Sequence, residues 1–335
     1  MGFYSGTSTG PNDLIDKLRI ALLAEGWTVD NFSAIGAGYR LHVYKTLDSE
    51  VSYFNFRSAI AETGVTLITE DNITGEYGTV TGLIVNGSTG YDGGELWHKQ
   101  PGYPQSVKNG NKSFGNVISP MSISAIPSYY FFFNGDSIHI AVEITAGKFQ
   151  FMSFGMLVKD GVYTGGQYFT ATLGSRSPGY DYMPAAGYGP RYFCNYNYWA
   201  STQYEINGAV RITADEVTSW RNAGNGLNND QIVFPCPNEY SPNSISGIAE
   251  FFYSKSPSSY NAIAAHFPLY TFLLRSDDNY SRIGWPEGVR FLNVTNYDPA
   301  EELVLGGDTW LVFPADGINI APINVGVGFA FLKDE

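Results

Sequence analysis

Hydrophobic residues recur at helical spacing in one segment near the start of the chain. From Leu14 onward, apolar side chains stand at i, i+4, i+7 and i+8. Asp13 lies where a carboxylate favours the helix dipole, and Gly26 can adopt the left-handed conformation that ends many helices. The pattern predicts an amphipathic helix over residues 13–25 and an extended segment from Trp27 onward.

Three apolar runs in the middle of the chain are separated by short turn sequences. They cover residues 129–133, 137–145 and 149–158. Asn134-Gly135 between the first two is a strong hairpin signal, because both central residues of a type I′ turn need positive φ. In the second run isoleucines and valines alternate with His139 and other residues, which predicts one core face and one wetter face. The runs therefore predict an antiparallel meander.

A second, shorter helix is predicted after Thr213. The sequence Thr-Ala-Asp-Glu has the spacing of a capping box, in which the first and fourth residues exchange hydrogen bonds with the main chain. Val217 and Trp220 follow it, and Gly224 can end the helix.

The remaining apolar segments are short and are bounded by Gly, Pro and Asn, as in antiparallel β proteins. Expected strands are 39–45, 51–57, 78–85, 289–294, 302–305, 309–313 and 326–332. Together the elements predict a mainly β protein with antiparallel sandwich-like or barrel-like sheets, a short N-terminal helix and one further short helix. We expect three regions: an N-terminal helix with β structure (1–120), a central meander with loops rich in Tyr and Gly (121–225), and a C-terminal β domain (226–335).

The composition adds a large core and a sparsely charged surface. Hydrophobic residues make up 44% of the 335 residues and aromatic residues 16%, whereas only 15% are charged. Such a surface suits permanent contacts, because little charge has to be desolvated when a neighbour covers it. The alternative is an ordinary tyrosine-rich β protein. Long loops usually make contacts, so the candidate interface residues are Tyr163, Tyr168, Tyr180, Tyr182, Tyr188, Tyr192, Tyr196, Tyr198 and Trp199.

Net charge and the distribution of apolar residues argue against several partners. The net charge is −13 and no run of Lys or Arg occurs, so nucleic-acid binding is not expected. No signal peptide is expected at the polar N-terminus, and no apolar stretch reaches the 18 or so residues of a membrane span. Cys194 and Cys236 fit no metal or redox motif, so two free thiols are expected, with a single disulfide as the alternative.

Residues suited to catalysis are few and scattered. His42, His98, His139 and His266 are isolated in sequence, and no metal or cofactor is expected. For His139 a solvent-facing or hydrogen-bonded imidazole is expected. Nucleophile-elbow, phosphate-loop and dinucleotide motifs do not occur. The acidic loops at residues 71–76 and 276–279 lack EF-hand spacing and are expected to be turns.

Asp92 and Glu95, next to Trp97, are the nearest approach to a glycosidase carboxylate pair. A Gly-Gly turn with solvated acids is the favoured interpretation of these two residues. The chain is therefore expected not to be an enzyme.

Three stretches resemble structural proteins of tailed bacteriophage particles. They are residues 2–29, with a polar lead, a helix and Gly-Trp-Thr-Val; residues 129–168, with the meander and Tyr-Thr-Gly-Gly-Gln-Tyr; and residues 306–331, with Gly-Gly-Asp-Thr-Trp, Phe-Pro and a closing Gly-Val-Gly-Phe-Ala-Phe. The resemblance implies a tail, baseplate or neck component, present in several copies in a virion assembled in the host cytoplasm. It implies contacts with copies of itself and other virion proteins, and no catalytic residues.

Two alternatives belong to other functional classes. An adhesin of the tail could stack exposed Tyr and Trp on a host-surface glycan and hydrogen-bond it with Asn and Asp. A glycan-degrading enzyme could use Asp92 or Glu95.

Overall fold

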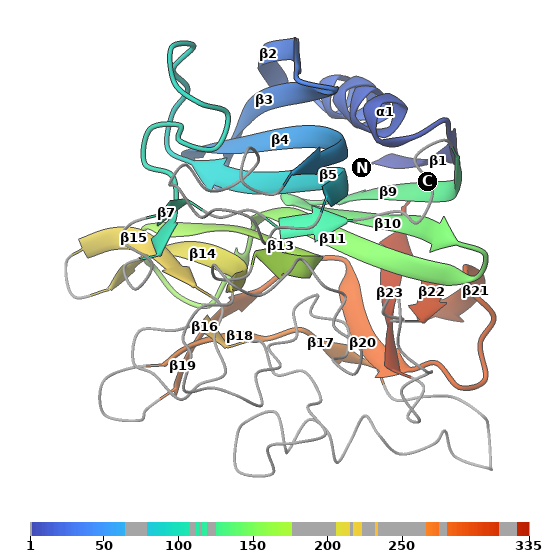
Figure 1. The fold of residues 1–335 in the computed structure, drawn as a ribbon. Helices are drawn as coiled ribbons and strands as arrows, with labels where there is room; N and C mark the ends of the chain where they lie inside the picture. Colours follow the sequence, from blue (N-terminus) through green and yellow to red (C-terminus); the bar gives the residue numbers. More distant parts are fainter. Residues whose placement is uncertain are drawn as a thin grey trace.

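A computed structural model describes residues 2–63, 79–106, 112–113, 116–118, 125–175, 206–214, 217–222, 232–233, 266–274, 280–314 and 327–334. Figure 1 shows these residues in layers: a helix on top, a large curved sheet in the middle and two smaller sheets below. Every strand pairing within the described residues is antiparallel. The predicted mainly β fold is confirmed.

The predicted N-terminal helix is confirmed as α1 (Pro11–Ala24). Proline at its first position needs no hydrogen bond for its nitrogen, which explains why the helix begins before Asp13. The Asp13 carboxylate accepts a hydrogen bond from the Thr9 main-chain nitrogen at 2.9 Å, and Gly26 follows the helix with φ of 79°. In the part of the chain that the structure describes, no helix has the length and apolar character needed to cross a membrane.

The middle layer is a twelve-stranded sheet with the order β1-β9-β10-β11-β13-β8-β5-β4-β3-β2, and β14 and β15 branch from β13. The first strands along the chain are β1 (Gly2–Ser8), β2 (Thr28–Ile35), β3 (Gly38–Leu47), β4 (Glu50–Thr63) and β5 (Thr79–Ser88). The others are β8 (Asn116–Ile118), β9 (Ile126–Asn134), β10 (Ser137–Thr145), β11 (Lys148–Met156), β13 (Gly165–Ser175), β14 (Ile206–Ala214) and β15 (Val217–Asn222). The expected division at residue 120 runs through this sheet, since β1 pairs with β9.

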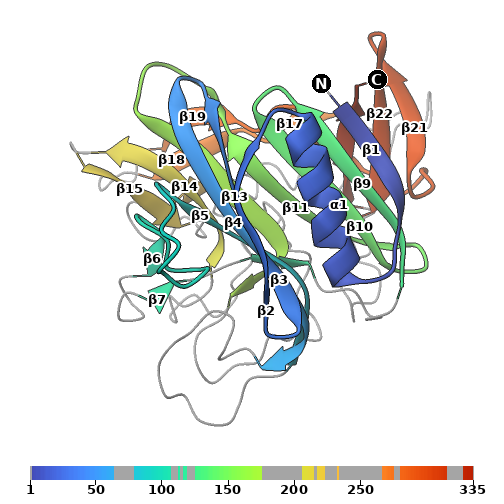
Figure 2. The same ribbon diagram turned by 90° about the horizontal axis from the view of Figure 1, so that it is seen from above.

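The sheet curves around α1. β1 and β2 stand at opposite ends of the strand order, yet both contact the helix, as the view from above shows (Figure 2). Leu14, Ile15, Leu18 and Leu22 of α1 are fully buried against the concave face, where they meet β-strand residues such as Ile140. The predicted apolar stripe of the helix therefore forms the first core.

Two smaller sheets lie below. One has the order β12 (Val158–Lys159), β19 (Tyr280–Trp285), β18 (Thr271–Leu274) and β16 (Ile232–Val233). The other has the order β17 (Phe267–Pro268), β20 (Val289–Asn293), β23 (Val327–Lys333), β22 (Asp308–Pro314) and β21 (Glu301–Leu305). β6 (Gln105–Ser106) and β7 (Lys112–Ser113) form a separate ribbon.

The second core is aromatic and lies between the large sheet and the five-stranded sheet. Phe132 of β9 stacks on Phe331 of β23 at 5.1 Å between ring centroids, and Phe149 of β11 meets Phe313 of β22 edge-on at 5.0 Å. The meander is thus confirmed, but its expected wetter face is wrong. His139 and the residues around it on β10 are buried on both faces, because a second sheet covers the side away from α1.

Two further predictions are wrong in the described residues. The second helix is replaced by the hairpin of β14 and β15, in which Thr213 pairs with Thr218 and Trp220 with Arg211. β-branched residues favour a strand, and pairing with β13 outweighs the local helix signal. The turn after β9 is not of type I′ either.

Asn134 pairs with Ser137, so the two turn residues between them are Gly135 and Asp136. Only Gly135 has positive φ, at 55°.

Candidate functional site

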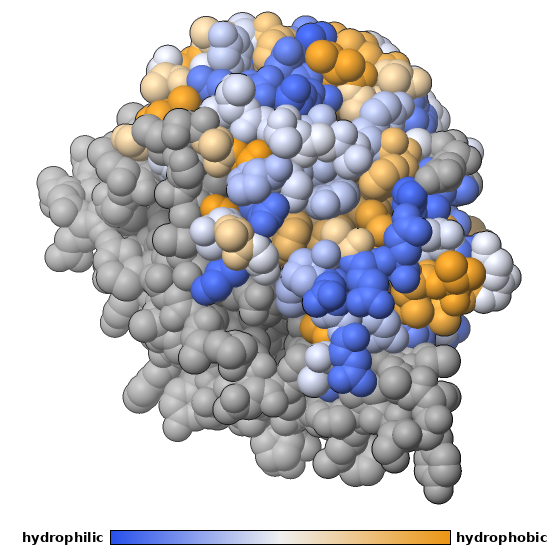
Figure 3. Space-filling view, turned by 90° about the vertical axis from the view of Figure 1, so that its right-hand side faces the viewer, coloured by the Kyte–Doolittle hydropathy of each residue, from blue (hydrophilic) through white to orange (hydrophobic). Residues whose placement is uncertain are grey.

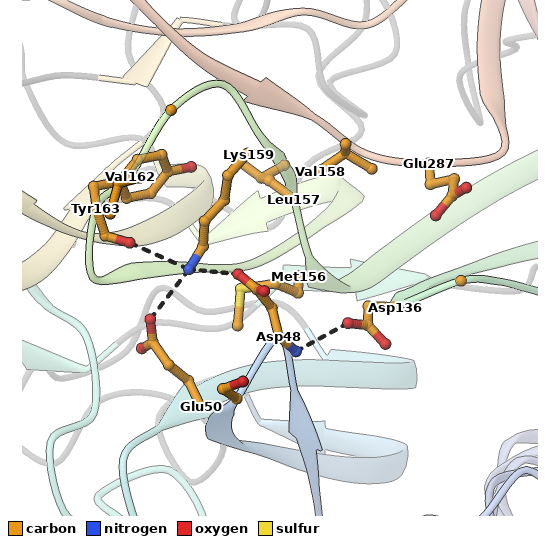
Figure 4. A pocket seen from close by; sticks show the side chains of 13 residues that line it. Asp48, Glu50, Asp136, Met156, Leu157, Val158, Lys159, Val162, Tyr163 and Glu287 are labelled. Carbon is orange, nitrogen blue, oxygen red and sulfur yellow. Dashed lines mark hydrogen bonds and ion pairs between the residues drawn. The ribbon is translucent and has the colours of Figure 1, made fainter.

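A cavity of about 800 Å³ lies where turns from several parts of the fold meet (Figure 4). Its walls come from the β3–β4 turn at residues 48–50, the β9–β10 turn at Gly135 and Asp136, the segment 156–163 that leaves β11, and Glu287 between β19 and β20. The large sheet and the four-stranded sheet therefore both shape the cavity.

The β3–β4 turn brings two carboxylates to the cavity. Asp48 and Ser49 have φ of 44° and 66°, so the chain reverses in two residues between the paired Leu47 and Glu50. The main-chain nitrogen of Asp48 donates to Oδ2 of Asp136 at 3.1 Å. This bond ties together two hairpin turns that are 88 residues apart in sequence.

Lys159 occupies the centre of the charged cluster. Its Nζ lies 2.8 Å from Asp48 Oδ2 and 3.2 Å from Glu50 Oε1, and it donates to the main-chain oxygen of Tyr163 at 3.2 Å. An ammonium has three donors, so these three acceptors satisfy it. Glu50 also accepts from the Gly165 nitrogen at 2.7 Å, which fixes its position.

The cavity has excess negative charge. Asp136 and Glu287 line it, and neither has an ion-pair partner among the described residues. Arg211 adds a second cation 3.7 Å from Glu50. Figure 4 shows Glu287 and Asp136 on the side of the cavity away from Lys159. Their oxygens can accept hydrogen bonds from hydroxyl or cationic groups of a ligand.

Tyr163 forms part of the cavity wall. Its hydroxyl donates to the Ile283 main-chain oxygen at 2.7 Å, and the Lys159 ammonium lies 5.3 Å from its ring centroid. Burial, together with the nearby carboxylates, raises the pKa of Tyr163. Val162 beside it is fully exposed at the rim.

Of the other interface candidates, only Tyr168 lies within the described residues. It has no exposed surface and packs in the aromatic core, so it supports the fold of its own chain. Burial raises its pKa. The remaining candidates lie outside the described residues: Tyr180, Tyr182, Tyr188, Tyr192, Tyr196, Tyr198 and Trp199. The same holds for Cys194, Cys236 and the two acidic loops.

A buried histidine fixes the main chain of Glu287. His139 Nε2 lies 2.5 Å from the Glu287 main-chain oxygen, and its Nδ1 contacts the Ser153 hydroxyl. Glu287 nitrogen donates to Ser137 Oγ at 3.1 Å. Burial lowers the pKa of His139 to about 4, so the ring is neutral at pH 7. The expected hydrogen-bonded imidazole is confirmed, and the solvent-facing alternative is wrong.

The other three histidines are wholly or partly buried, and burial lowers the pKa of each. His42 Nδ1 lies 2.7 Å from Asn55 Oδ1, and burial lowers the pKa of both His42 and His98 to about 4. Burial also lowers the pKa of His266. Within the described ranges, no group of three or more His, Cys, Asp or Glu side chains is arranged to hold a metal ion.

The Asp92 and Glu95 loop is the expected turn with exposed acids. Asp92 Oδ1 accepts from the Gly94 nitrogen at 2.8 Å, which is local turn chemistry. Buried Gln100 holds the loop by accepting from the Asp92 nitrogen at 2.7 Å. Trp97 is only 1% exposed, so it cannot stack on a sugar in this conformation.

The sequence patterns indicate few of the residues that form the cavity. Asp48 and Asp136 stand in turns between expected strands, and that position is a detectable signal for exposed carboxylates. Their meeting with Lys159 depends on how the sheets stack, which no local pattern encodes. Searches of known protein-family models and of curated proteins find no match to the chain.

Proposed function

We propose that this chain is a structural subunit of a tailed-phage particle, in its tail or baseplate. In this role it associates with copies of itself and with other virion proteins through aromatic-rich β surfaces and loops. The resemblance in residues 2–29, 129–168 and 306–331 suggests the particle, and the exposed sheet edges support association as the activity.

The observation that carries the proposal is a sheet edge that combines open main-chain groups with an exposed apolar side chain. β21 is the last strand of the five-stranded sheet, and among the described residues it pairs only with β22. Val304 on this strand is 66% exposed. Figure 3 looks at the side of the molecule that carries β1 and β21 and shows a hydrophobic patch there beside hydrophilic surface. Exposed Glu301 and Glu302 occupy the first part of this edge, whereas its second part, Leu303 to Leu305, is apolar and favours a contact with another chain.

The interior suits a rigid structural subunit. The central meander is buried on both faces, by α1 on one side and by aromatic rings on the other. Buried polar side chains hold main-chain groups, as His139 holds Glu287 beside the meander and Gln100 holds the Asp92 loop elsewhere in the fold. These bonds lock turns in place and favour a building block that keeps its shape.

Immuno-electron microscopy of purified phage particles tests the proposal. Antibodies raised against the purified chain should label one repeated position on the tail or baseplate of particles whose genome carries this sequence. Particles from a deletion mutant serve as the control and should be defective in assembly. A chain abundant in infected cells but absent from purified particles would contradict the proposal.

The cavity favours a second candidate function, binding of a host-surface glycan. A volume of about 800 Å³ is in the range of ligand sites, and Asp136 and Glu287 supply acceptors for sugar hydroxyls. Glycan-array binding followed by calorimetry tests it, with a double variant Asp136→Asn and Glu287→Gln. Binding that the double variant abolishes, while Asp92→Asn leaves it intact, would support the adhesin.

A further inference from the structure

The outer edge of β1 is open to another strand. β1 stands at one end of the order of the twelve-stranded sheet and, among the described residues, pairs only with β9. Its central residues, Ser5, Gly6 and Thr7, are exposed. No charged residue and no proline occurs in Gly2–Ser8. Charged residues, prolines and bulges are the usual features that keep an edge strand from pairing. Of these, β1 has only a bulge, between Gly6 and Ser8.

The register of β9 shows which way its main-chain groups point. Asn134 and Ser137 flank a two-residue turn, so their main chains bond to each other. Main-chain direction alternates along a strand. The main-chain groups of Phe133 and Phe131 therefore point to the other neighbour of β9, which is β1.

The same alternation identifies the main-chain groups of β1 that point away from β9. Gly2 stands opposite Phe133, and Tyr4 stands opposite Phe131, so these two residues bond to β9. Phe3 lies between Gly2 and Tyr4, and Ser5 follows Tyr4. The main-chain N–H and C=O groups of Phe3 and Ser5 therefore point away from β9. An extended strand is the partner that satisfies such alternating donors and acceptors.

The charged side chains beside β1 include Glu25, whose Oε1 accepts from the Tyr4 hydroxyl at 2.8 Å. Lys333 Nζ lies 5.5 Å from the Phe3 ring centroid and forms an ion pair with Glu302 at 2.9 Å. Exposed Val304 belongs to the same strand as Glu302, and Figures 1 and 2 both place β21 on the β1 side of the molecule. A partner strand could therefore form main-chain hydrogen bonds with β1 and contact apolar surface on β21.

We propose that β1 pairs antiparallel with β1 of a second copy of this chain, joining two twelve-stranded sheets across a two-fold axis. Two copies that each carry −13 repel each other least where the pairing residues themselves are uncharged, and Gly2–Ser8 is such a segment. A two-fold contact sets the same patch against itself, and an uncharged strand opposes no like charge when it pairs with its own copy. This inference rests on the assembly function proposed above and specifies one contact between copies of the chain.

Sedimentation velocity of the purified full chain, from about 1 to about 100 µM, tests the pairing. The wild-type chain should form a dimer. Ser5→Pro removes one outward N–H without removing a bond to β9, and proline is tolerated at a strand edge. It should raise the dimer dissociation constant at least about tenfold. Ser5→Val keeps the N–H and is the matched control, which should remain dimeric.

Hydrogen exchange provides a second readout that does not depend on a variant. The amides of Phe3 and Ser5 should exchange more slowly as protein concentration rises, while those of Gly2–Ser8 that bond to β9 should not change. Circular dichroism confirms that Ser5→Pro folds. A dimer that Ser5→Pro leaves intact, or a chain that stays monomeric at every concentration, would overturn the pairing.

The pairing and the proposed function fail separately. A monomeric chain that still labels phage particles refutes only the β1 pairing. A β1-paired dimer that never enters particles refutes only the virion role.

Discussion

The two faces of the central sheet are packed in different ways. On the α1 side, aliphatic residues of the helix such as Leu18 meet Ile140 and its neighbours, and a buried cluster of rings stands beside them, formed by Trp27, Phe54, Phe56 and Phe154. On the other side, rings from two sheets interlock: Phe331 lies within 5.8 Å of Phe132, Phe151 and Phe313, measured between centroids. The first core joins the N-terminal helix to strands that include β10, more than 100 residues later, and the second joins segments about 180 residues apart. The aromatic core therefore holds the C-terminal sheet to the rest of the fold.

The largest expected effect comes from removing a ring of the aromatic core. Phe331→Ala should lower the free energy of unfolding by about 3–5 kcal/mol, because the cavity left between two sheets cannot collapse. Chemical denaturation with fluorescence detection measures this change. Val304→Ala, at an exposed aliphatic position on β21, is the control and should cost less than about 0.5 kcal/mol.

A matching change in the helical core should cost slightly less. Leu18→Ala should lower the free energy of unfolding by about 2–5 kcal/mol, since Leu18 is fully buried under the curved sheet. Leu23 on the same helix is 45% exposed, so Leu23→Ala should leave stability within about 0.5 kcal/mol. Equal losses for the two leucines would show that α1 does not pack as described.

Buried His139, at the side of the aromatic core, should make the free energy of unfolding depend on pH. His139 has a pKa of about 4 in the folded chain and 6.5 in an unstructured peptide, so the unfolded state binds the proton first as pH falls. The contribution of neutral His139 to the free energy of unfolding is fully present above pH 6.5 and is lost progressively as pH falls toward 4. His139 alone should contribute a loss of about 2 kcal/mol between pH 7 and pH 5.

His139→Asn tests this contribution. Its absolute stability will be lower, but its loss between pH 7 and pH 5 should be about 2 kcal/mol smaller than in the wild type. His42 and His98 also have lowered pKa values, so the variant keeps part of the pH dependence. An unchanged pH dependence would contradict a neutral, buried His139.

The smallest expected effect concerns the charged cluster at the rim. Lys159→Met should cost about 1–2 kcal/mol, because Asp48 loses its cation and Glu50 keeps only the more distant Arg211, while both carboxylates remain partly hydrated. The loss should shrink as salt rises, which thermal unfolding at several ionic strengths can measure. Lys45→Met is a suitable control, since the only hydrogen bond of the Lys45 ammonium within the described residues goes to a main-chain oxygen, that of Glu25. A salt-independent loss would argue for packing by the Lys159 stem instead of the ion pairs.

Local patterns were sufficient for the parts of the fold that are built from neighbours in sequence. α1, the meander and most C-terminal strands lie where the periodicity predicts them. The hairpin at Thr213 shows the limit of this approach. A capping-box spacing there competes with β13, a strand more than 35 residues earlier, and the pairing prevails. β1 shows the opposite limit, since its short, uncharged sequence has no alternation to mark it as a strand.

The candidate site depended almost wholly on packing. Tyr163 is the one cavity residue that the sequence indicates as an interface candidate, and the expectation there is a surface contact. Lys159 meets Asp48 and Glu50 across more than 100 residues of chain. Such a distance has no signature in spacing or composition.

By itself, the sequence determined that this protein has an antiparallel β architecture, one amphipathic helix and a large aromatic interior, because periodicity and composition act over a few residues at a time. The way the sheets stack buries the meander on both faces and places neutral His139 against the Glu287 main-chain oxygen. It also leaves β1, among the described residues, paired on one side only. Those outcomes depend on which sheet covers which face, and stacking of sheets is set by the sum of distant contacts.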